Sequence, residues 1–243
     1  MKLLTSVRNL EEAQQVVAGG SDWLDLKEPR SGALGAVSID TLKAVVDWAR
    51  CNAPGLPLSA TIGDERTTPA TMLASVTEVA ATGVNYVKLG LFADSLSKIM
   101  SDTLAEVLAS HHNVIVICFV EKLLDLAVVE EIIGWGAAGM MLDTAEKRSG
   151  SLTAHLSMAE ISDFVSLVRR ANVLCGLAGK LTLRDIDKLS SCRADYLGFR
   201  SAICKQAKRN SDVCSFEVRK LRQAMTSVSS QSDIERDAEL MLE

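Results

Sequence analysis

Apolar segments of strand length alternate with amphipathic segments along almost the whole chain, and this alternation restricts the fold more than any other feature of the sequence. Each strand-like segment is followed by apolar residues at helical spacing. The segment 114–120 is almost wholly apolar, which is typical of a strand buried on both faces. We predict eight strands, over residues 3–7, 23–27, 56–62, 86–91, 114–120, 139–143, 173–178 and 196–200.

Eight helices are predicted after these strands. The first begins at Asn9 and ends at Gly19. The others cover residues 39–50, 70–81, 96–110, 124–133, 158–170, 183–190 and 213–228. Eight near-equal units in 243 residues favour an α/β fold of the closed (β/α)8 TIM-barrel type over an open, doubly wound sheet. We predict one catalytic barrel domain over residues 1–228 and a polar, acidic tail over 229–243, either a frayed helix or disordered.

Composition narrows the class of protein further. Hydrophobic residues make up 48% of the chain but aromatic residues only 4%, as in a parallel sheet packed by helices. The net charge of -5 and the lack of a dense basic stripe argue against nucleic-acid binding. No segment reaches the length of a membrane span, and the N-terminus does not resemble a signal peptide. Six cysteines without a C-x-x-C pair suit a reducing compartment, so we expect a soluble, cytoplasmic protein.

Charged residues stand at the ends of three predicted strands, where an unused charge is costly to bury. Asp25 and Lys27 share one face of their strand because side chains alternate, and Lys88 and Asp143 end two later strands. Lys147 follows in the loop after Asp143. In a barrel these strand ends converge on one mouth, which is where barrel enzymes carry their active sites.

Clustered amines at such a mouth indicate carbonyl chemistry. Repulsion between ammonium ions and partial burial both lower the pKa of a lysine and favour a neutral, nucleophilic amine. A neutral amine attacks an aldehyde or ketone to give an iminium, and Asp25 and Asp143 could then move protons. We therefore predict an aldol-type reaction that needs no cofactor. The alternative is that the Asp–Lys couples are structural ion pairs that fix the barrel rim.

The turns after the last two predicted strands contain small residues before a helix, where backbone N–H groups can bind an anion. Barrels commonly bind phosphate at these two loops, and the short basic segment 205–209 could serve a phosphate as well. The histidines, at 111, 112 and in a loop at 155, are poorly placed for a metal site, so we expect no metal. The predicted substrate- and phosphate-binding residues are Gly179, Lys180, Arg200, Ser201, Thr61 and Asp64.

The residues at these strand ends resemble one known family over residues 1 to about 215. That family is the (5-formylfuran-3-yl)methyl phosphate synthases of methanofuran biosynthesis, also called 4-(hydroxymethyl)-2-furancarboxaldehyde-phosphate synthases. Their enzymes join two molecules of glyceraldehyde 3-phosphate into a phosphorylated furan aldehyde and release phosphate and water. The matching stretches are 25–29 with 32–36, 59–64, 86–91, 141–144 with Lys147, 177–179, and 198–200 with Cys204.

The resemblance implies roles for the charged strand ends. Lys27 would form a Schiff base and Lys88 would accept a proton, while Asp25, Asp143 and Lys147 would assist proton transfers. The implied partner is a small phosphorylated aldehyde, with no nucleic acid or membrane involved, and a homo-oligomer is left open. Two positions depart from the pattern that we expect: Lys180 stands in place of Ser, and Ser201 in place of Gly.

Two other functions remain open from the sequence. One is a different phosphate-binding barrel enzyme that acts on sugar phosphates, either aldolase-like or epimerase-like. The other is a barrel without catalysis that serves as a scaffold or binder. Buried charges at Lys27, Lys88 and Asp143 argue against the second, because a site without activity has no use for them.

Overall fold

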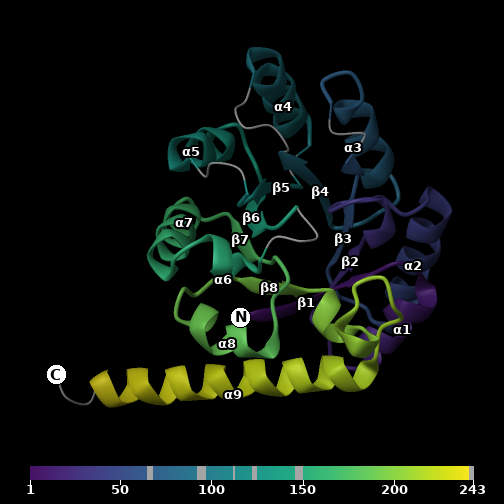
Figure 1. Cartoon of the computed structure of the whole chain (residues 1–243). Coiled ribbons are helices and arrows are strands. Elements are labelled where there is room, and N and C mark those ends of the chain that lie inside the picture. The colour runs from purple at the N-terminus through teal and green to yellow at the C-terminus, as the bar shows by residue number, and fades with distance from the viewer. Residues whose placement is uncertain (65–67, 92–96, 112, 122–124, 146–149, 241–243) are drawn as a thin grey trace.

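Eight parallel strands form a closed barrel in chain order, and helices surround it (Figure 1). The computed structural model describes residues 1–64, 68–91, 97–111, 113–121, 125–145 and 150–240, with side chains up to Val228 in the last helix. The predicted TIM barrel is therefore confirmed. The strands are β1 Lys2–Val7, β2 Trp23–Leu26, β3 Leu58–Thr61, β4 Tyr86–Leu91, β5 Val114–Phe119, β6 Gly139–Asp143, β7 Leu174–Leu177 and β8 Tyr196–Phe199.

The helices follow the strands as the pattern predicts, with some additions. The α-helices are α1 Leu10–Ala18, α2 Ile39–Asn52, α3 Met72–Ala80, α4 Lys98–Ser110, α5 Leu126–Gly134, α6 Leu152–His155, α7 Met158–Arg170, α8 Leu183–Ser190 and α9 Ser215–Leu240. Three short 3-10 helices lie wholly within the described residues and were not predicted from the sequence: η1 Pro29–Ser31, η3 Ser201–Ile203 and η4 Lys205–Ala207. The α6 helix is also unpredicted, and it places His155 in a helix rather than in a loop.

Polar side chains fix where several helices begin. The carboxamide of Asn9 accepts a hydrogen bond from the backbone N–H of Glu12 at 2.9 Å, which caps α1. Ser38 and Ser97 cap α2 and α4 in the same way. Ser157 and Glu160 form a capping box at the start of α7. These caps satisfy N–H groups that the first helical turn leaves free, so each helix starts close to its predicted position.

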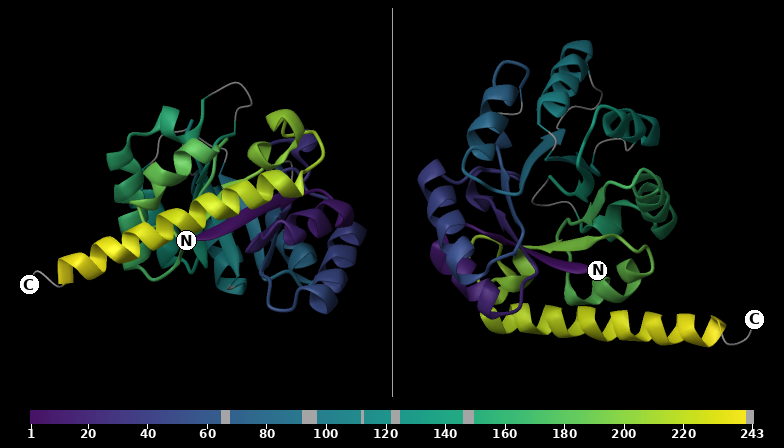
Figure 2. Two further views of the ribbon diagram at one scale, coloured as in Figure 1. Left: turned by 90° about the horizontal axis from the view of Figure 1, so that it is seen from below. Right: turned by 180° about the vertical axis from the view of Figure 1, so that it is seen from behind.

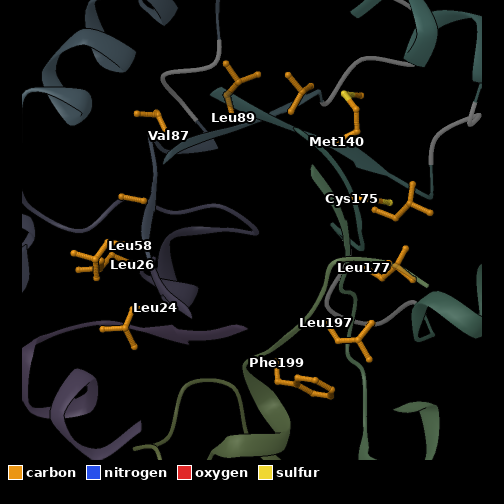
Figure 3. Close-up of a cluster of buried hydrophobic side chains, with 14 of the residues drawn as sticks. Leu24, Leu26, Leu58, Val87, Leu89, Met140, Cys175, Leu177, Leu197 and Phe199 are labelled. Atoms are coloured by element: carbon orange, nitrogen blue, oxygen red, sulfur yellow. The ribbon is translucent and has the colours of Figure 1, made fainter. Parts of the chain in front are cut away.

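Alternation along the strands divides the side chains between two cores. Leu24 and Leu26 of β2 point outward to the helices, as do Val87 and Leu89 of β4 (Figure 3). The residues between them point into the barrel, which places Trp23 and Asp25 in its interior. Asp25 thus lies on the inner face, as the two-residue period predicts.

Aromatic side chains fill the lower part of the barrel interior. The ring of Trp23 lies 5.0 Å from that of Tyr86 and 4.9 Å from that of Tyr196, centroid to centroid. Gly176 makes room for this packing, because a Cβ there would lie 2.3 Å from the Tyr196 ring. The indole N–H of Trp23 donates to Ser59 at 3.1 Å. These rings form an aromatic floor in the interior, and none of them lines the cavity at the mouth of the barrel.

The last helix, α9, packs along one side of the barrel and extends past it (Figure 2). Val218, Leu221 and Met225 bury its apolar face against the barrel. The helix continues without a break across Val228, where the sequence predicts the end of the barrel domain. The tail is therefore helical as far as Leu240, and the domain boundary stays a prediction.

Two further features concern the cysteines and the length of the helices. All six cysteines are free. In the part of the chain that the structure describes, no helix combines the length and the apolar character needed to cross a membrane.

Candidate active site

A cavity opens at the carboxyl ends of the strands, above the aromatic floor. This is the mouth at which the charged strand ends were predicted to meet. Loops after β2, β6, β7 and β8 contribute to its wall. The predicted residues that line it are Asp25, Lys27, Lys88, Asp143, Gly179, Lys180, Arg200 and Ser201.

Lys88 and Asp25 form an ion pair at the bottom of this cavity. Lys88 Nζ lies 3.0 Å from Asp25 Oδ1, and Lys88 is 0% exposed. Ser59 donates a hydrogen bond to Asp25 Oδ1 at 2.7 Å, and Ser6 donates to Oδ2 at 3.2 Å. Lys88 also lies over the Tyr196 ring, 5.5 Å from its centroid. The pair is buried on every side, so each charge depends on the other.

Burial acts in opposite directions on the two partners. It lowers the pKa of Lys88 because it disfavours the ammonium form, and the attraction of Asp25 only partly opposes this. For Asp25, burial alone would raise the pKa, but the charges of Lys88 and Lys27 and the Ser59 hydrogen bond outweigh it, so the pKa is lowered. Asp25 is thus held as a carboxylate, and Lys88 gives up its proton more readily than an ordinary lysine.

Lys27 lies at the top of the same cavity beside Asp143. Its Nζ is 3.7 Å from Asp143 Oδ2, and the side chains of Lys27 and Asp143 are 11% and 10% exposed. Asp143 Oδ1 accepts the backbone N–H of Thr144 at 2.7 Å, which fixes the carboxylate. Lys27 is therefore the lysine that a molecule entering the cavity meets first, with Lys88 behind it.

Thr61 and Asp64 hold the loop after β2 and do not line the cavity. The Thr61 hydroxyl donates to the carbonyl of Gly35 at 3.0 Å. The Asp64 carboxylate accepts the N–H groups of Ala33 at 2.9 Å and Leu34 at 2.8 Å. Ala33 and Leu34 do line the cavity. Thr61 and Asp64 thus position the loop that lines the cavity, and their predicted contact with a substrate stays a prediction.

Arg200 lines the cavity, but its guanidinium is fully engaged within the protein. It donates to Glu12 with Nη1 at 2.6 Å and with Nη2 at 3.2 Å. Nε donates to the carbonyl of Arg209 at 2.8 Å, and the remaining donors reach the carbonyls of Ser6 and Ser211. These five hydrogen bonds use all five N–H groups of an arginine. The predicted phosphate contact of Arg200 would have to break one of them.

Glu12 carries the other half of this network. It lies in the first turn of α1, is 3% exposed, and also pairs with Arg8. Burial would raise its pKa, but the hydrogen bonds from Arg200 and Arg8 outweigh burial, so the pKa is lowered. Glu12 therefore ties α1 to the loop after β8 through a buried charge pair.

Arg200→Lys should lower the free energy of unfolding by about 2–3 kcal/mol, because lysine keeps the charge but cannot reach five acceptors. Urea unfolding measures this. Arg219→Lys is the matched control, since Arg219 is exposed on α9 and should change stability by less than about 0.5 kcal/mol. Equal effects of the two substitutions would contradict the structural role of Arg200.

The turn after β7 brings Gly179 and Lys180 to the mouth. Gly179 has φ of +105°, and a Cβ there would lie 2.8 Å from Thr144 Cγ2. Its carbonyl accepts the N–H of Leu152 at 2.9 Å. Only glycine suits this position, which keeps the turn close to the loop after β6. Ser201 begins η3 after the neighbouring strand β8.

Sequence reasoning missed several residues of the site, and one predicted residue cannot be placed. Lys147 lies outside the described residues. Ser6, Ser59 and Glu12 were not predicted, because serines on a strand and an acid in a first helical turn are common in any fold. Arg209 also lines the cavity. It ends the basic segment 205–209, which the sequence already indicated for a phosphate without singling out this residue. Among the described residues, no group of three or more His, Cys, Asp or Glu is arranged to hold a metal.

Comparison with known sequences identifies close relatives. The model of the 4-HFC-P synthase family matches residues 3–222. A protein of Methylorubrum extorquens, provisionally named a (5-formylfuran-3-yl)methyl phosphate synthase, is 33% identical over 226 residues, covering 92% of the chain and 91% of that protein. A synthase of the same name from Methanococcus maripaludis is 30% identical over 225 residues, 86% of the chain and 92% of the relative. The synthase of the same name from Archaeoglobus fulgidus is 29% identical over 216 residues, which cover 84% of this chain and 91% of that protein.

Solved structures with a similar fold are more distant in sequence. Phosphoribosyl anthranilate isomerase from Thermus thermophilus matches with a TM-score of 0.65 at 15% identity, covering 94% of this chain and all of that one. A 3-hexulose-6-phosphate synthase matches with a TM-score of 0.62 at 17% identity, and the match covers 93% of this chain and all of that one. These structural likenesses support the barrel fold alone. The family match over residues 3–222, by contrast, includes all eight strands whose ends form the mouth. The chain belongs to the 4-HFC-P synthase family.

Proposed function

We propose that this protein is a lyase that condenses two molecules of glyceraldehyde 3-phosphate into (5-formylfuran-3-yl)methyl phosphate through a Schiff base on Lys27. The product would serve the synthesis of a methanofuran-type carrier of one-carbon units in the cytoplasm. Membership of the 4-HFC-P synthase family supports the reaction class. The observation that carries the proposal is the pairing of two lysines with two aspartates in one cavity, with one amine accessible and the other buried.

Accessibility favours Lys27 as the nucleophile. Its side chain is 11% exposed at the top of the cavity, whereas that of Lys88 is 1% exposed below it. An aldehyde that enters from the mouth meets Lys27 first, because Lys88 is the more deeply buried of the two lysines. The amine of Lys27 adds to the aldehyde carbon to give a carbinolamine, which loses water to give an iminium. The iminium then withdraws electrons from the neighbouring carbon.

The overall reaction balances without a redox partner. Two glyceraldehyde 3-phosphates contain the atoms of one (5-formylfuran-3-yl)methyl phosphate, one phosphate and two waters. A carbon–carbon bond forms between the two aldehydes, one C–O bond to phosphate breaks, and the furan oxygen bridges two carbons. Each elimination moves one proton from carbon and expels one oxygen leaving group. The protein therefore needs an electron sink and proton carriers, which an iminium and nearby amines and carboxylates supply.

The buried pair is suited to the proton transfers. Lys88, with its lowered pKa, can accept a proton from the carbon next to the iminium, and Asp25 stabilises the ammonium that results. Asp143, 3.7 Å from Lys27, is placed to exchange protons with the carbinolamine. A part for Lys147 in these transfers is proposed on the family resemblance alone, as that residue is not described.

Product analysis tests the reaction. Purified protein incubated with glyceraldehyde 3-phosphate should release one phosphate for every two aldehydes consumed, and mass spectrometry should find the furan aldehyde phosphate. A six-carbon sugar bisphosphate without phosphate release would instead identify an aldolase-like enzyme. No consumption of the aldehyde would favour a barrel without catalysis.

The rate should depend on pH through Lys88. Because only the neutral amine accepts a proton, kcat/KM should rise by up to about tenfold per pH unit on the acidic side. The rise should level off below pH 10.5, the ordinary lysine pKa, since burial lowers the pKa of Lys88. Initial rates across pH measure the profile. Lys88→Arg should remove this rise, and an unchanged profile in that variant would exclude Lys88 as the proton acceptor.

A further inference from the structure

The cavity above Lys27 adjoins a second, wider cavity on the side of α8 and α9. The first has about 50 Å³ available to the centres of water molecules, enough for a few waters, and the second has about 640 Å³. Three residues line both cavities: Lys180, Ser201 and Arg209. The narrow cavity can take the reacting end of a phosphorylated aldehyde, so a bulky phosphate has to lie outward, toward these shared residues.

Arg209 is held at this junction by a loop that is itself well fixed. An antiparallel bridge between Cys204 and Val213 closes the loop. Arg200 Nε donates to the carbonyl of Arg209 at 2.8 Å, so the buried pair of Arg200 and Glu12 anchors the backbone at this point. The side chain of Arg209 reaches across the mouth, where Nη2 donates to the carbonyl of Gly32 at 3.1 Å.

The guanidinium of Arg209 keeps donors that the protein does not use. Its Nε is buried and has no hydrogen-bond partner among the described residues. Arg209 forms no ion pair with a described carboxylate. The carboxylates of Asp143 and Asp64 attract it from a distance, and Asp64 is occupied by the N–H groups of Ala33 and Leu34. Burial lowers the pKa of Arg209, since it disfavours the charged form. A buried cation with an unused N–H lowers the stability of the protein unless an anion accepts that hydrogen bond and balances the charge.

Several other cations around the two cavities are engaged within the protein. All five donors of Arg200 are used inside the protein. Lys220 Nζ donates to Glu217 at 3.1 Å, and Lys27 and Lys88 face Asp143 and Asp25. Arg209 is thus the best-placed arginine for an incoming anion, and arginine offers the forked donor pair that suits phosphate oxygens.

We propose that Arg209, on the loop after β8, binds the phosphate of the aldehyde that reacts at Lys27. This inference rests on the proposed function for the identity of the substrate. Arg200 and Glu12 act as positioning residues, because they hold the loop that carries Arg209. The phosphate lies at the junction of the two cavities, and the aldehyde carbon points down toward Lys27.

Titration with inorganic phosphate tests the anion site separately from the reaction. Calorimetry should show phosphate binding to the unchanged protein, and Arg209→Gln should weaken it about 10- to 100-fold, as expected for the loss of charge-assisted hydrogen bonds. Arg219→Gln, on the exposed face of α9, is the matched control and should bind phosphate as the unchanged protein does. If Arg209→Gln does not fold, Arg209→Lys keeps the charge without Nε and should weaken binding by a smaller factor.

Two comparisons separate this inference from the proposed function. Borohydride trapping of glyceraldehyde, which has no phosphate, should be equal in the unchanged protein and Arg209→Gln, whereas KM for glyceraldehyde 3-phosphate should rise at least about tenfold in the variant. Equal phosphate affinity in the two proteins, or no phosphate binding by either, would overturn the assignment of Arg209. Absence of the furan product with phosphate binding lost in Arg209→Gln would overturn the reaction but support the anion site.

Discussion

Replacing Lys27 by alanine should lower kcat/KM for glyceraldehyde 3-phosphate by about 10³-fold or more, because the substitution removes the amine that forms the covalent intermediate. The fold should survive. Lys27 lies at the cavity top, 3.7 Å from Asp143, and without it Asp143 still accepts the N–H of Thr144. Loss of this largely buried pair should lower the free energy of unfolding by about 1–3 kcal/mol, which a folded barrel can tolerate. Steady-state kinetics and urea unfolding measure the two effects.

Lys43→Ala is the control for this substitution, since Lys43 is exposed on α2, away from the residues that line the cavity. It should leave both rate and stability unchanged. Turnover by Lys27→Ala within tenfold of the unchanged protein would exclude a Schiff base on Lys27 as a required intermediate. Loss of the folded state in Lys27→Ala would show that Lys27 is needed for the fold and not for the chemistry alone.

Asp25→Asn should produce the largest loss of stability among single changes in the site, about 3–5 kcal/mol. The reason is that Lys88 is 0% exposed and Asp25 is its ion-pair partner at 3.0 Å. Without the carboxylate, Lys88 must either stay charged and unpaired or lose its proton. Replacing both partners, as in Asp25→Asn with Lys88→Met, should restore part of the stability because no buried charge remains. A double-mutant cycle in urea measures the coupling energy.

Asp47→Asn provides the comparison for an exposed pair. Asp47 lies 3.8 Å from Arg50 on α2, with side chains 76% and 62% exposed, so its loss should cost less than about 1 kcal/mol. A cost for Asp25→Asn as small as that for Asp47→Asn would show that water reaches the buried pair. A double variant less stable than both single variants would show that Asp25 and Lys88 do not depend on each other.

The barrel and the charged centre of the site could be predicted because both follow from short-range pattern. The two-residue period of β2 places Trp23, Asp25 and Lys27 on one face whatever the rest of the chain does. Once eight strands are recognised, the geometry of a barrel brings Lys88 and Asp143 to the same mouth. The structure brings these residues together as predicted, at 3.0 Å for Lys88 with Asp25 and 3.7 Å for Lys27 with Asp143.

Contacts between residues far apart in the chain could not be predicted in the same way. Arg200 and Glu12 are separated by 188 positions, and nothing in the local sequence of either indicates the pair. The sequence therefore predicted a phosphate contact for Arg200, whose donors the structure shows to be used by Glu12 and backbone carbonyls. Asp64 is a similar case, because its partners are backbone N–H groups that only a folded loop presents.

Arg200 and Asp64 both act on the mouth of the barrel through the loops that they hold. Arg200 and Asp64 fix the loops after β8 and β2, and those loops carry Arg209 and Leu34 into the cavity wall. Charged residues near the mouth thus divide into those that face the substrate and those that hold loops in place. The position of a charged residue at a strand end does not tell whether it faces the substrate or holds a loop. The number of its hydrogen-bond donors that have no partner within the protein does.

The location of the covalent intermediate decides whether this account of the site is right. Protein incubated with glyceraldehyde 3-phosphate and reduced with borohydride should carry one added triose phosphate, and peptide mass spectrometry should locate it on Lys27. Lys27→Ala treated in the same way should carry none. An adduct on Lys88 or on another lysine, or no adduct at all during turnover, would contradict the account.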